Sequence, residues 1–159
     1  MTGEQRLKAF AETSYKKTLT KVNHHIYHFL GYGISNSIAV IGDTSVILID
    51  ALDCPDYARE LKRELAELTD KPVKTIIYTH GHPDHRGGAG AFRDTVEEVI
   101  AFAPEKPMLQ YNDRLYHVLN QRGTYQFGYE LTDEEAISEG IGIREGIAVG
   151  KGGFDPIPP

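Results

Sequence analysis

Residues 73–88 read Val-Lys-Thr-Ile-Ile-Tyr-Thr-His-Gly-His-Pro-Asp-His-Arg-Gly-Gly, and this stretch decides both the fold and the site. Its first six residues are β-rich and almost free of charge, which predicts a strand covered on both faces. Four potential metal ligands follow within six residues: His80, His82, Asp84 and His85. A polar turn would rarely gather so many ligands directly after a buried strand, so the run predicts a metal site.

The spacing of these ligands predicts two cations. Alternate side chains of an extended loop point the same way, so His80 and His82 can reach one cation. Asp84 and His85 turn toward a second one, and Asp84 is expected to be catalytic as well as a ligand. Two cations that share a water lower its pKa from about 16 toward about 7, which favours hydrolysis at neutral pH. Zinc suits these ligands best, with iron and manganese as alternatives.

Three apolar runs before this stretch predict strands. Val22–Leu30 alternates apolar and polar residues until Gly31 and Gly33 break the run, which predicts a first strand. Ser37–Ile41 ends at Gly42-Asp43, and Ser45–Ile49 begins directly after Thr44, which predicts a β-hairpin.

A helix is predicted between the hairpin and residue 73. Pro55 suits its first turn and Asp53 is a plausible N-cap, while Pro72 ends the helix near Asp70. Strand, helix and strand in this order predict a right-handed crossover and a parallel pair. The histidine run then lies at the carboxyl end of a central strand, where open α/β sheets place ligands.

The chain after the histidine run is less regular. A short helix near Ala89–Arg93, a strand near Val99–Phe102 and a helix over about Met108–Gln121 are predicted there. The last segment, from about residue 139, is rich in Gly and Pro and is expected to be irregular. We expect one partial domain over residues 1–159.

Composition narrows the class of protein. At 159 residues, 40% hydrophobic and 25% charged, the chain can bury a core. Its single cysteine, Cys54, excludes an intrachain disulfide and a cysteine-based metal site. A net charge of −6 without a basic cluster argues against nucleic acid. Charged residues in Met1–Thr13 and the lack of a long apolar run predict neither a signal peptide nor a membrane segment, so a cytoplasmic location is expected.

The pattern His-x-His-x-Asp-His after a buried strand resembles the metallo-beta-lactamase superfamily, and within it the chain is most similar to the alkyl sulfatases. The resemblance implies a metallo-beta-lactamase-like αββα sandwich, of which this α/β (α+β) chain supplies about the N-terminal half. It also implies zinc-dependent hydrolysis of sulfate esters of long-chain alcohols. The residues that carry it are Ser35-Asn36, Gly42-Asp43-Thr44, Ile47-Leu-Ile-Asp50, Tyr78 to Gly88, Ala103-Pro-Glu105, Asn112 and Arg122 to Gly128.

Three further residues are candidates for the site. Arg122 can fork onto two sulfate oxygens and Tyr125 can donate to a third, although a surface arginine and a packed tyrosine are equally simple explanations. Asp50 ends its strand beside the histidine run and could orient a metal-bound histidine, or it could simply cap a turn.

Similar proteins complete both metal shells with ligands further downstream than Pro159. One sheet without the second layer of the sandwich would leave an apolar face uncovered, so we expect a homo-oligomer or a complementing chain. Two alternatives to alkyl sulfate hydrolysis stay open. One is hydrolysis of another ester, such as a thioester, lactone or phosphodiester, and the other is a non-catalytic half-domain.

Overall fold

The computed structural model describes residues 1–103, 118, 121–122, 125, 132, 134–138 and 140–159. The chain divides into two compact units: Met1–Phe102 with Ile137–Pro159, and Ala103–Ala136. The first unit contains the histidine run. The second contains Arg122 and Tyr125, and the helix predicted over Met108–Gln121 lies almost wholly outside the described residues.

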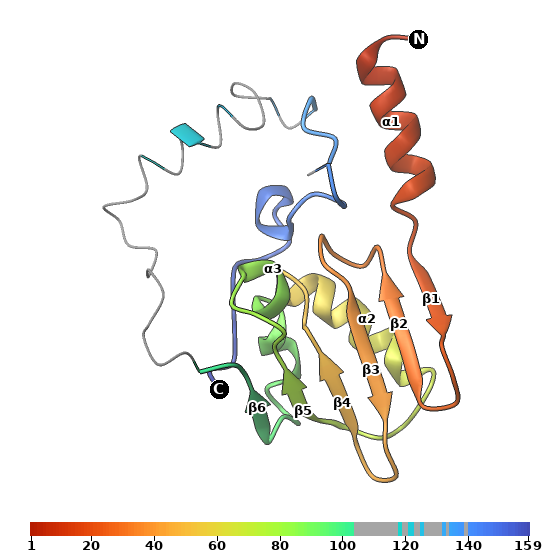
Figure 1. Ribbon diagram of the computed structural model, residues 1–159, viewed down its shortest axis with the longest axis vertical. Helices are drawn as coiled ribbons and strands as arrows, with labels where there is room; N and C mark the ends of the chain where they lie inside the picture. The colour runs from red at the N-terminus through yellow and green to blue at the C-terminus, as the bar shows by residue number, and fades with distance from the viewer. Residues whose placement is uncertain (104–117, 119–120, 123–124, 126–131, 133, 139) are drawn as a thin grey trace. The chain divides into compact units, whose positions relative to one another are not determined.

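The first unit is built on a mixed sheet whose six strands lie side by side in chain order (Figure 1). The first four strands pair antiparallel, and the last three pair parallel. The predicted α/β class, the hairpin and the parallel pair are therefore confirmed. The strands are β1 (Thr18–Lys21), β2 (Ile26–Leu30), β3 (Ser37–Ile41), β4 (Val46–Ile49), β5 (Val73–Ile77) and β6 (Glu98–Ile100).

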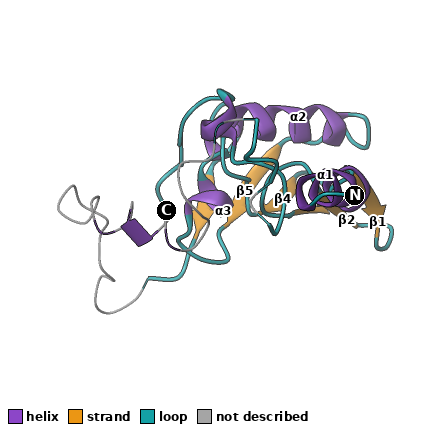
Figure 2. Cartoon of the chain, turned by 90° about the horizontal axis from the view of Figure 1, so that it is seen from above, coloured by secondary structure: helices purple, strands orange, loops and turns teal. Residues whose placement is uncertain are grey.

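One long helix covers one face of this sheet (Figure 2). α2 (Pro55–Ala66) buries Ala58, Leu61 and Leu65. The strand residues in the same core include a cross-strand row of Ala39, Leu48 and Ile76, and burying this apolar surface stabilises the unit. The other helices given by the described residues are α1 (Gly3–Ser14), α3 (Pro83–Arg86) and the short 3-10 helices η1 (Ala89–Phe92) and η3 (Gly146–Val149). No helix among the described residues is long and apolar enough to cross a bilayer.

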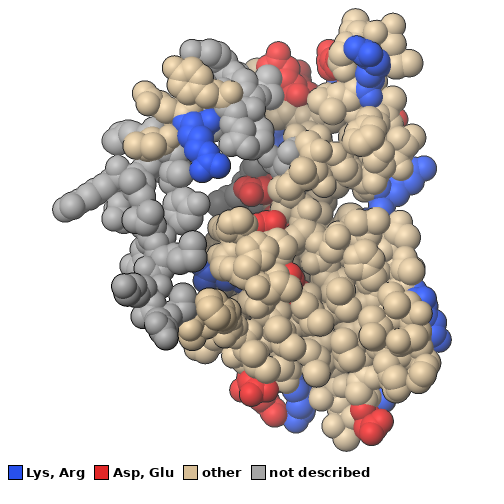
Figure 3. All heavy atoms as spheres, viewed as in Figure 1, with Lys and Arg blue, Asp and Glu red and all other residues tan. Residues whose placement is uncertain are grey.

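The opposite face of the sheet is apolar, and in the described part of the chain its side chains are half-buried or exposed. Because side chains alternate along a strand, the neighbours of the buried row point away from α2. They form a second row, Ile38, Ile49, Ile77 and Ile100, across four paired strands. This face is turned toward the viewer in Figure 3, where its surface carries few charged atoms except at its margins. The prediction that residues 73–78 are covered on both faces is therefore wrong for the described chain.

Two other predictions about individual elements are wrong. Val22–Leu30 is not one strand, because the Asn23 side chain accepts hydrogen bonds from the backbone N–H groups of His25 and Ile26. These bonds turn the chain, so β1 and β2 form a hairpin instead. Asp53 is not the N-cap of α2: Cys54 occupies that position without a side-chain bond.

Candidate metal centre

The histidine run directly follows β5, as predicted, and lies against the loop that follows β4. Two backbone hydrogen bonds join the segments: Ala51 N–H donates to the His85 carbonyl at 2.8 Å, and Gly88 N–H donates to the Leu52 carbonyl at 2.9 Å. Asp50 and Leu52 both adopt positive φ, 58° and 64°, which an aspartate tolerates better than a leucine. This tight path brings the end of β4 within bonding distance of the metal-ligand candidates.

Asp50 is the centre of the hydrogen-bond network at this point, and its side chain is almost fully buried. Its Oδ1 accepts from the Thr79 N–H at 2.9 Å. Its Oδ2 accepts from the Thr79 hydroxyl and lies 2.7 Å from both Thr79 Oγ1 and His85 Nδ1. The buried Ser37 hydroxyl donates to the Asp50 carbonyl at 2.6 Å, which fixes the backbone of the carboxylate. Asp50 therefore contacts a ligand candidate directly.

The three imidazoles of the run lie together. The His80 ring centroid is 4.6 Å from that of His82 and 4.0 Å from that of His85. His80 and His82 are exposed, whereas His85 and Asp84 are half-buried. The Arg86 side chain stabilises the histidine run, because its Nε–H donates to the Gly81 carbonyl at 3.0 Å. All four predicted ligands thus lie within six residues: His80 and His82 follow β5, and Asp84 and His85 belong to α3.

His85 lies between two carboxylates. Its Nδ1 faces Asp50, and its Nε2 is 3.2 Å from Oδ2 of Asp84. A neutral imidazole carries one ring proton, and in His85 this proton is on Nδ1, which donates it to the Asp50 carboxylate. Nε2 and the Asp84 carboxylate are then two acceptors that face each other. Such a pair needs a cation between its members, either a second proton or a metal ion.

A metal ion fits this gap. Two ligands bound at about 2.0–2.1 Å to a tetrahedral zinc ion lie about 3.3 Å apart, close to the observed Nε2–Oδ2 separation. Among the described residues, no group of three or more His, Cys, Asp or Glu side chains is placed to hold one metal ion. The predicted pairs are His80 with His82 and Asp84 with His85, although the His80 ring lies closer to that of His85 than to that of His82. Metal binding by these pairs stays a prediction.

Asp53 is a second buried carboxylate near the site. Its Oδ2 accepts from the Gly146 N–H at 2.5 Å, while Oδ1 has no partner among the described residues. Burial raises the pKa of Asp53, the negative charge of Asp84 adds to this, and backbone hydrogen bonds oppose it. Asp53 therefore anchors the C-terminal segment to the loop between β4 and α2.

Tyrosine hydroxyls anchor the same segment. Tyr57 donates to the Arg144 carbonyl at 3.1 Å, and burial raises the pKa of Tyr57 to about 12. Tyr15 and Tyr78 donate to carbonyls of the segment at 2.9 Å in each case. Residues 140–159 thus contact the core at several points although their only regular element is η3.

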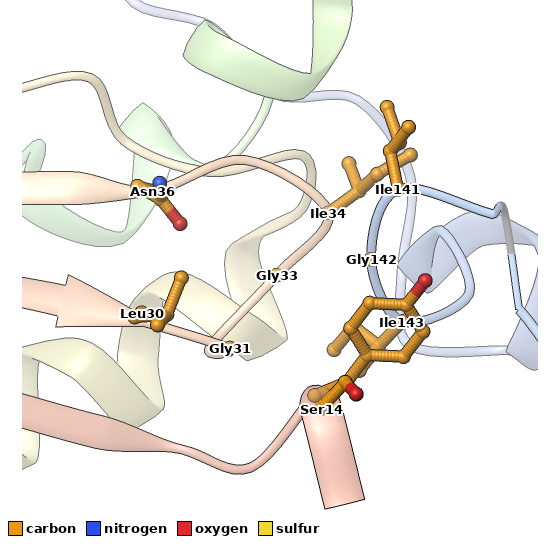
Figure 4. Close-up of a pocket in the computed structure, with 10 residues that line it drawn as sticks. Ser14, Leu30, Gly31, Gly33, Ile34, Asn36, Ile141, Gly142 and Ile143 are labelled. Atoms are coloured by element: carbon orange, nitrogen blue, oxygen red, sulfur yellow. The ribbon is translucent and has the colours of Figure 1, made fainter. Parts of the chain in front are cut away.

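A small hollow lies between the end of α1, the loop after β2 and the C-terminal segment (Figure 4). Its volume is about 30 Å³, and its lining includes Leu30, Ile34, Ile141 and Ile143. This volume suits a water molecule and is far too small for an alkyl chain. We therefore do not assign a substrate to it.

Two predicted substrate residues lie outside the unit that contains the histidine run, and two residues that support this run were not predicted as site residues. Arg122 and Tyr125 are exposed and belong to the second unit, so their role in binding sulfate stays a prediction. Thr79, which bonds Asp50, was missed. Ser35 was seen only as part of the family resemblance, and its hydroxyl donates to the Asp84 carbonyl. No spacing rule reveals that contact, since 49 residues separate its partners.

A mixed sheet that presents a histidine and aspartate loop at the carboxyl ends of its parallel strands is typical of metal-dependent α/β enzymes. The model of the metallo-beta-lactamase superfamily matches residues 30–157. The chain therefore belongs to the metallo-beta-lactamase superfamily, and the predicted fold is confirmed as a partial domain of this type.

Proteins of known activity support the predicted branch. The chain is 34% identical over 122 residues to an alkyl/aryl-sulfatase of Saccharomyces cerevisiae, covering 72% of this chain and 19% of the relative. It is 27% identical to the solved stereoselective inverting sec-alkylsulfatase of Pseudomonas sp., with a TM-score of 0.55, covering 69% of this chain and 19% of that one. The resemblance to the alkyl sulfatase branch is therefore confirmed.

A third relative has a different activity. The chain is 40% identical over 70 residues to the alpha subunit of a 2,4-dinitroanisole O-demethylase of Nocardioides sp., covering 43% of this chain and 21% of the relative. The chain spans about a fifth of the length of the curated relatives that it matches.

Proposed function

We propose that this chain supplies one half of a zinc-dependent hydrolase site that cleaves sulfate esters of alkyl chains. The observation that supports the metal is the position of His85 between the Asp50 and Asp84 carboxylates, where a metal ion or a second ring proton at Nε2 would separate two facing acceptors. The sulfate ester is supported by the alkylsulfatase relatives.

We assign separate roles to the residues of the site: metal binding, orientation of a metal ligand, and binding of the sulfate group. His80 with His82, and Asp84 with His85, would hold two zinc ions, and zinc when bound supplies a Lewis acid that lowers the pKa of water to about 7. Asp50 holds His85 in the orientation that leaves Nε2 available. Arg122 and Tyr125 are proposed to bind the sulfate oxygens through a guanidinium fork and a phenolic hydroxyl.

The experiment that tests this function combines metal content with turnover. Zinc per chain is measured by elemental mass spectrometry on protein purified without chelator, and release of sulfate from dodecyl sulfate is then followed on zinc-loaded protein. Close to two zinc equivalents with sulfate release is the expected result. Zinc binding without sulfate release would refute the sulfate assignment, and protein that takes up no zinc would refute the metal site.

One second activity has specific support. The O-demethylase relative suggests that the same site could cleave an aryl methyl ether. A substrate panel that adds 2,4-dinitroanisole, a thioester, a lactone and a phosphodiester to dodecyl sulfate separates these reactions. Turnover of one of the added substrates but not of dodecyl sulfate would replace our assignment.

We also propose that the open sheet face is covered by protein, in a homo-oligomer or by a complementing chain. Residues 73–78 have the composition of a strand buried on both faces, yet the described chain covers only one. Exposed Ile47 and Ile100, at 36% and 45%, flank the half-buried Ile49 and Ile77 on this face. A continuous apolar surface of this kind usually marks an interface.

In a homo-oligomer, Ile47→Lys should shift the solution mass from oligomer to monomer, because it places a charge within the apolar face. Leu7→Lys is the matched control, since Leu7 is 40% exposed on α1 rather than on the sheet. Multi-angle light scattering measures both variants beside the original chain. A monodisperse monomer for the original chain, or equal effects of both variants, would count against the homo-oligomer.

A further inference from the structure

Thr79 connects Asp50 to a second histidine of the candidate metal centre. Its hydroxyl oxygen is 2.7 Å from Oδ2 of Asp50 and 3.0 Å from Nδ1 of His80. The hydroxyl has one proton to donate, and an ionised carboxylate can only accept. The proton of Thr79 therefore goes to Asp50, and the hydroxyl oxygen is left to accept from His80.

This assignment fixes the proton positions on two rings. His80 must carry its proton on Nδ1 to donate to Thr79, which leaves Nε2 with a free lone pair. His85 donates its own Nδ1 proton to Oδ2 of Asp50, which leaves Nε2 free as well. A metal ion binds the unprotonated nitrogen of a neutral imidazole. The Asp50 carboxylate thus orients His80 from one predicted ligand pair and His85 from the other, with Nε2 of each ring available to a metal ion.

We propose that Thr79 is a positioning residue that relays the orienting effect of Asp50 to His80, while Asp50 acts on His85 directly. His82 differs, because no described residue donates to or accepts from its ring; it packs against the His80 ring in a T-shaped arrangement. Thr79 donates both its backbone N–H and its hydroxyl proton to the same carboxylate, so its hydroxyl is held in place. This inference rests on the proposed metal site.

The test uses histidine NMR on the full, metal-free chain at pH 8, where free imidazole is neutral. Long-range ¹H–¹⁵N correlations report which ring nitrogen carries the proton. In the original protein, His80 should carry its ring proton on Nδ1, and His85 should carry a proton on Nδ1 whether or not a second proton takes the place of the metal at Nε2. Thr79→Val should abolish the preference at His80 and leave His85 unchanged, because the bond from His85 to Asp50 remains. Asp50→Ala should abolish both preferences.

A zinc titration against a chromophoric chelator gives the second readout. Thr79→Val should weaken zinc binding by about 10- to 100-fold, the usual cost of losing an outer partner of a metal ligand. Thr79→Ser keeps the hydroxyl and should restore most of the affinity. Thr75→Val is the matched control, since it makes the same change on β5 at a side chain outside this network.

Two outcomes would overturn the relay. One is a His80 ring that keeps its Nδ1 proton in Thr79→Val, and the other is a loss of zinc affinity that Thr79→Ser fails to restore. Unfolding curves for each variant separate these results from loss of the fold. The proton positions are read without metal or substrate, so the relay can stand or fail independently of the proposed hydrolysis.

Discussion

A Gly88→Ala variant should lose about 3 kcal/mol of unfolding free energy, at the upper end of the cost of overpacking a core. A Cβ at position 88 would lie 2.7 Å from both the Ala58 Cβ and the Cys54 carbonyl oxygen, and closer still to the Ala51 carbonyl oxygen. Backbone atoms cannot rotate away as a side chain can, so the two loops must separate. Urea unfolding followed by circular dichroism measures the change.

Gly81→Ala provides the control within the same loop. A Cβ at Gly81 has nothing within 4 Å, so this variant should unfold like the original chain. Zinc affinity should fall in Gly88→Ala because separating the loops moves Asp50 away from His85. Equal stability of the two variants would show that the loops are not packed together as described.

The packing around Gly88 also shows how far the sequence determines the fold. Short apolar runs and the turn residues between them predicted β3, β4, β5 and the parallel crossover, because these signals are local and each element obeys them. The first hairpin was missed because a single side chain, Asn23, reverses a run that otherwise resembles one strand. α1 was also missed, although Thr2 and Gln5 form a capping box that is visible in the sequence.

The candidate site was predictable in its ligands but only partly in its support. Four ligands within six residues form a local signal, whereas the bond between Asp50 and His85 joins residues 35 positions apart. That contact was anticipated only as one of two roles for Asp50. Asp53 shows the opposite case: its position before Pro55 indicated a helix cap, but tertiary packing uses its carboxylate to bind Gly146, 93 residues away.

Asp84→Asn should have the largest effect on metal binding. An asparagine amide can donate a proton to Nε2 of His85, so it fills the gap between the two acceptors with a hydrogen bond and removes the need for a cation. Loss of an outer partner alone costs about 10- to 100-fold in zinc affinity, so loss of a direct ligand should cost more than about 100-fold. Turnover of dodecyl sulfate should fall with it.

The unfolding free energy of Asp84→Asn without metal tests whether the cation between Asp84 and His85 is a metal ion or a proton. In metal-free buffer Asp84→Asn should be at least as stable as the original chain, because a neutral amide relieves the contact between Nε2 and the carboxylate. Asp43→Asn makes the same change at an exposed turn and should alter neither zinc affinity nor stability. If Asp84→Asn retains the zinc affinity of the original chain, Asp84 is not a ligand. If it is also less stable without metal, the cation between Asp84 and His85 is a proton, and the loop is held together by an ion pair.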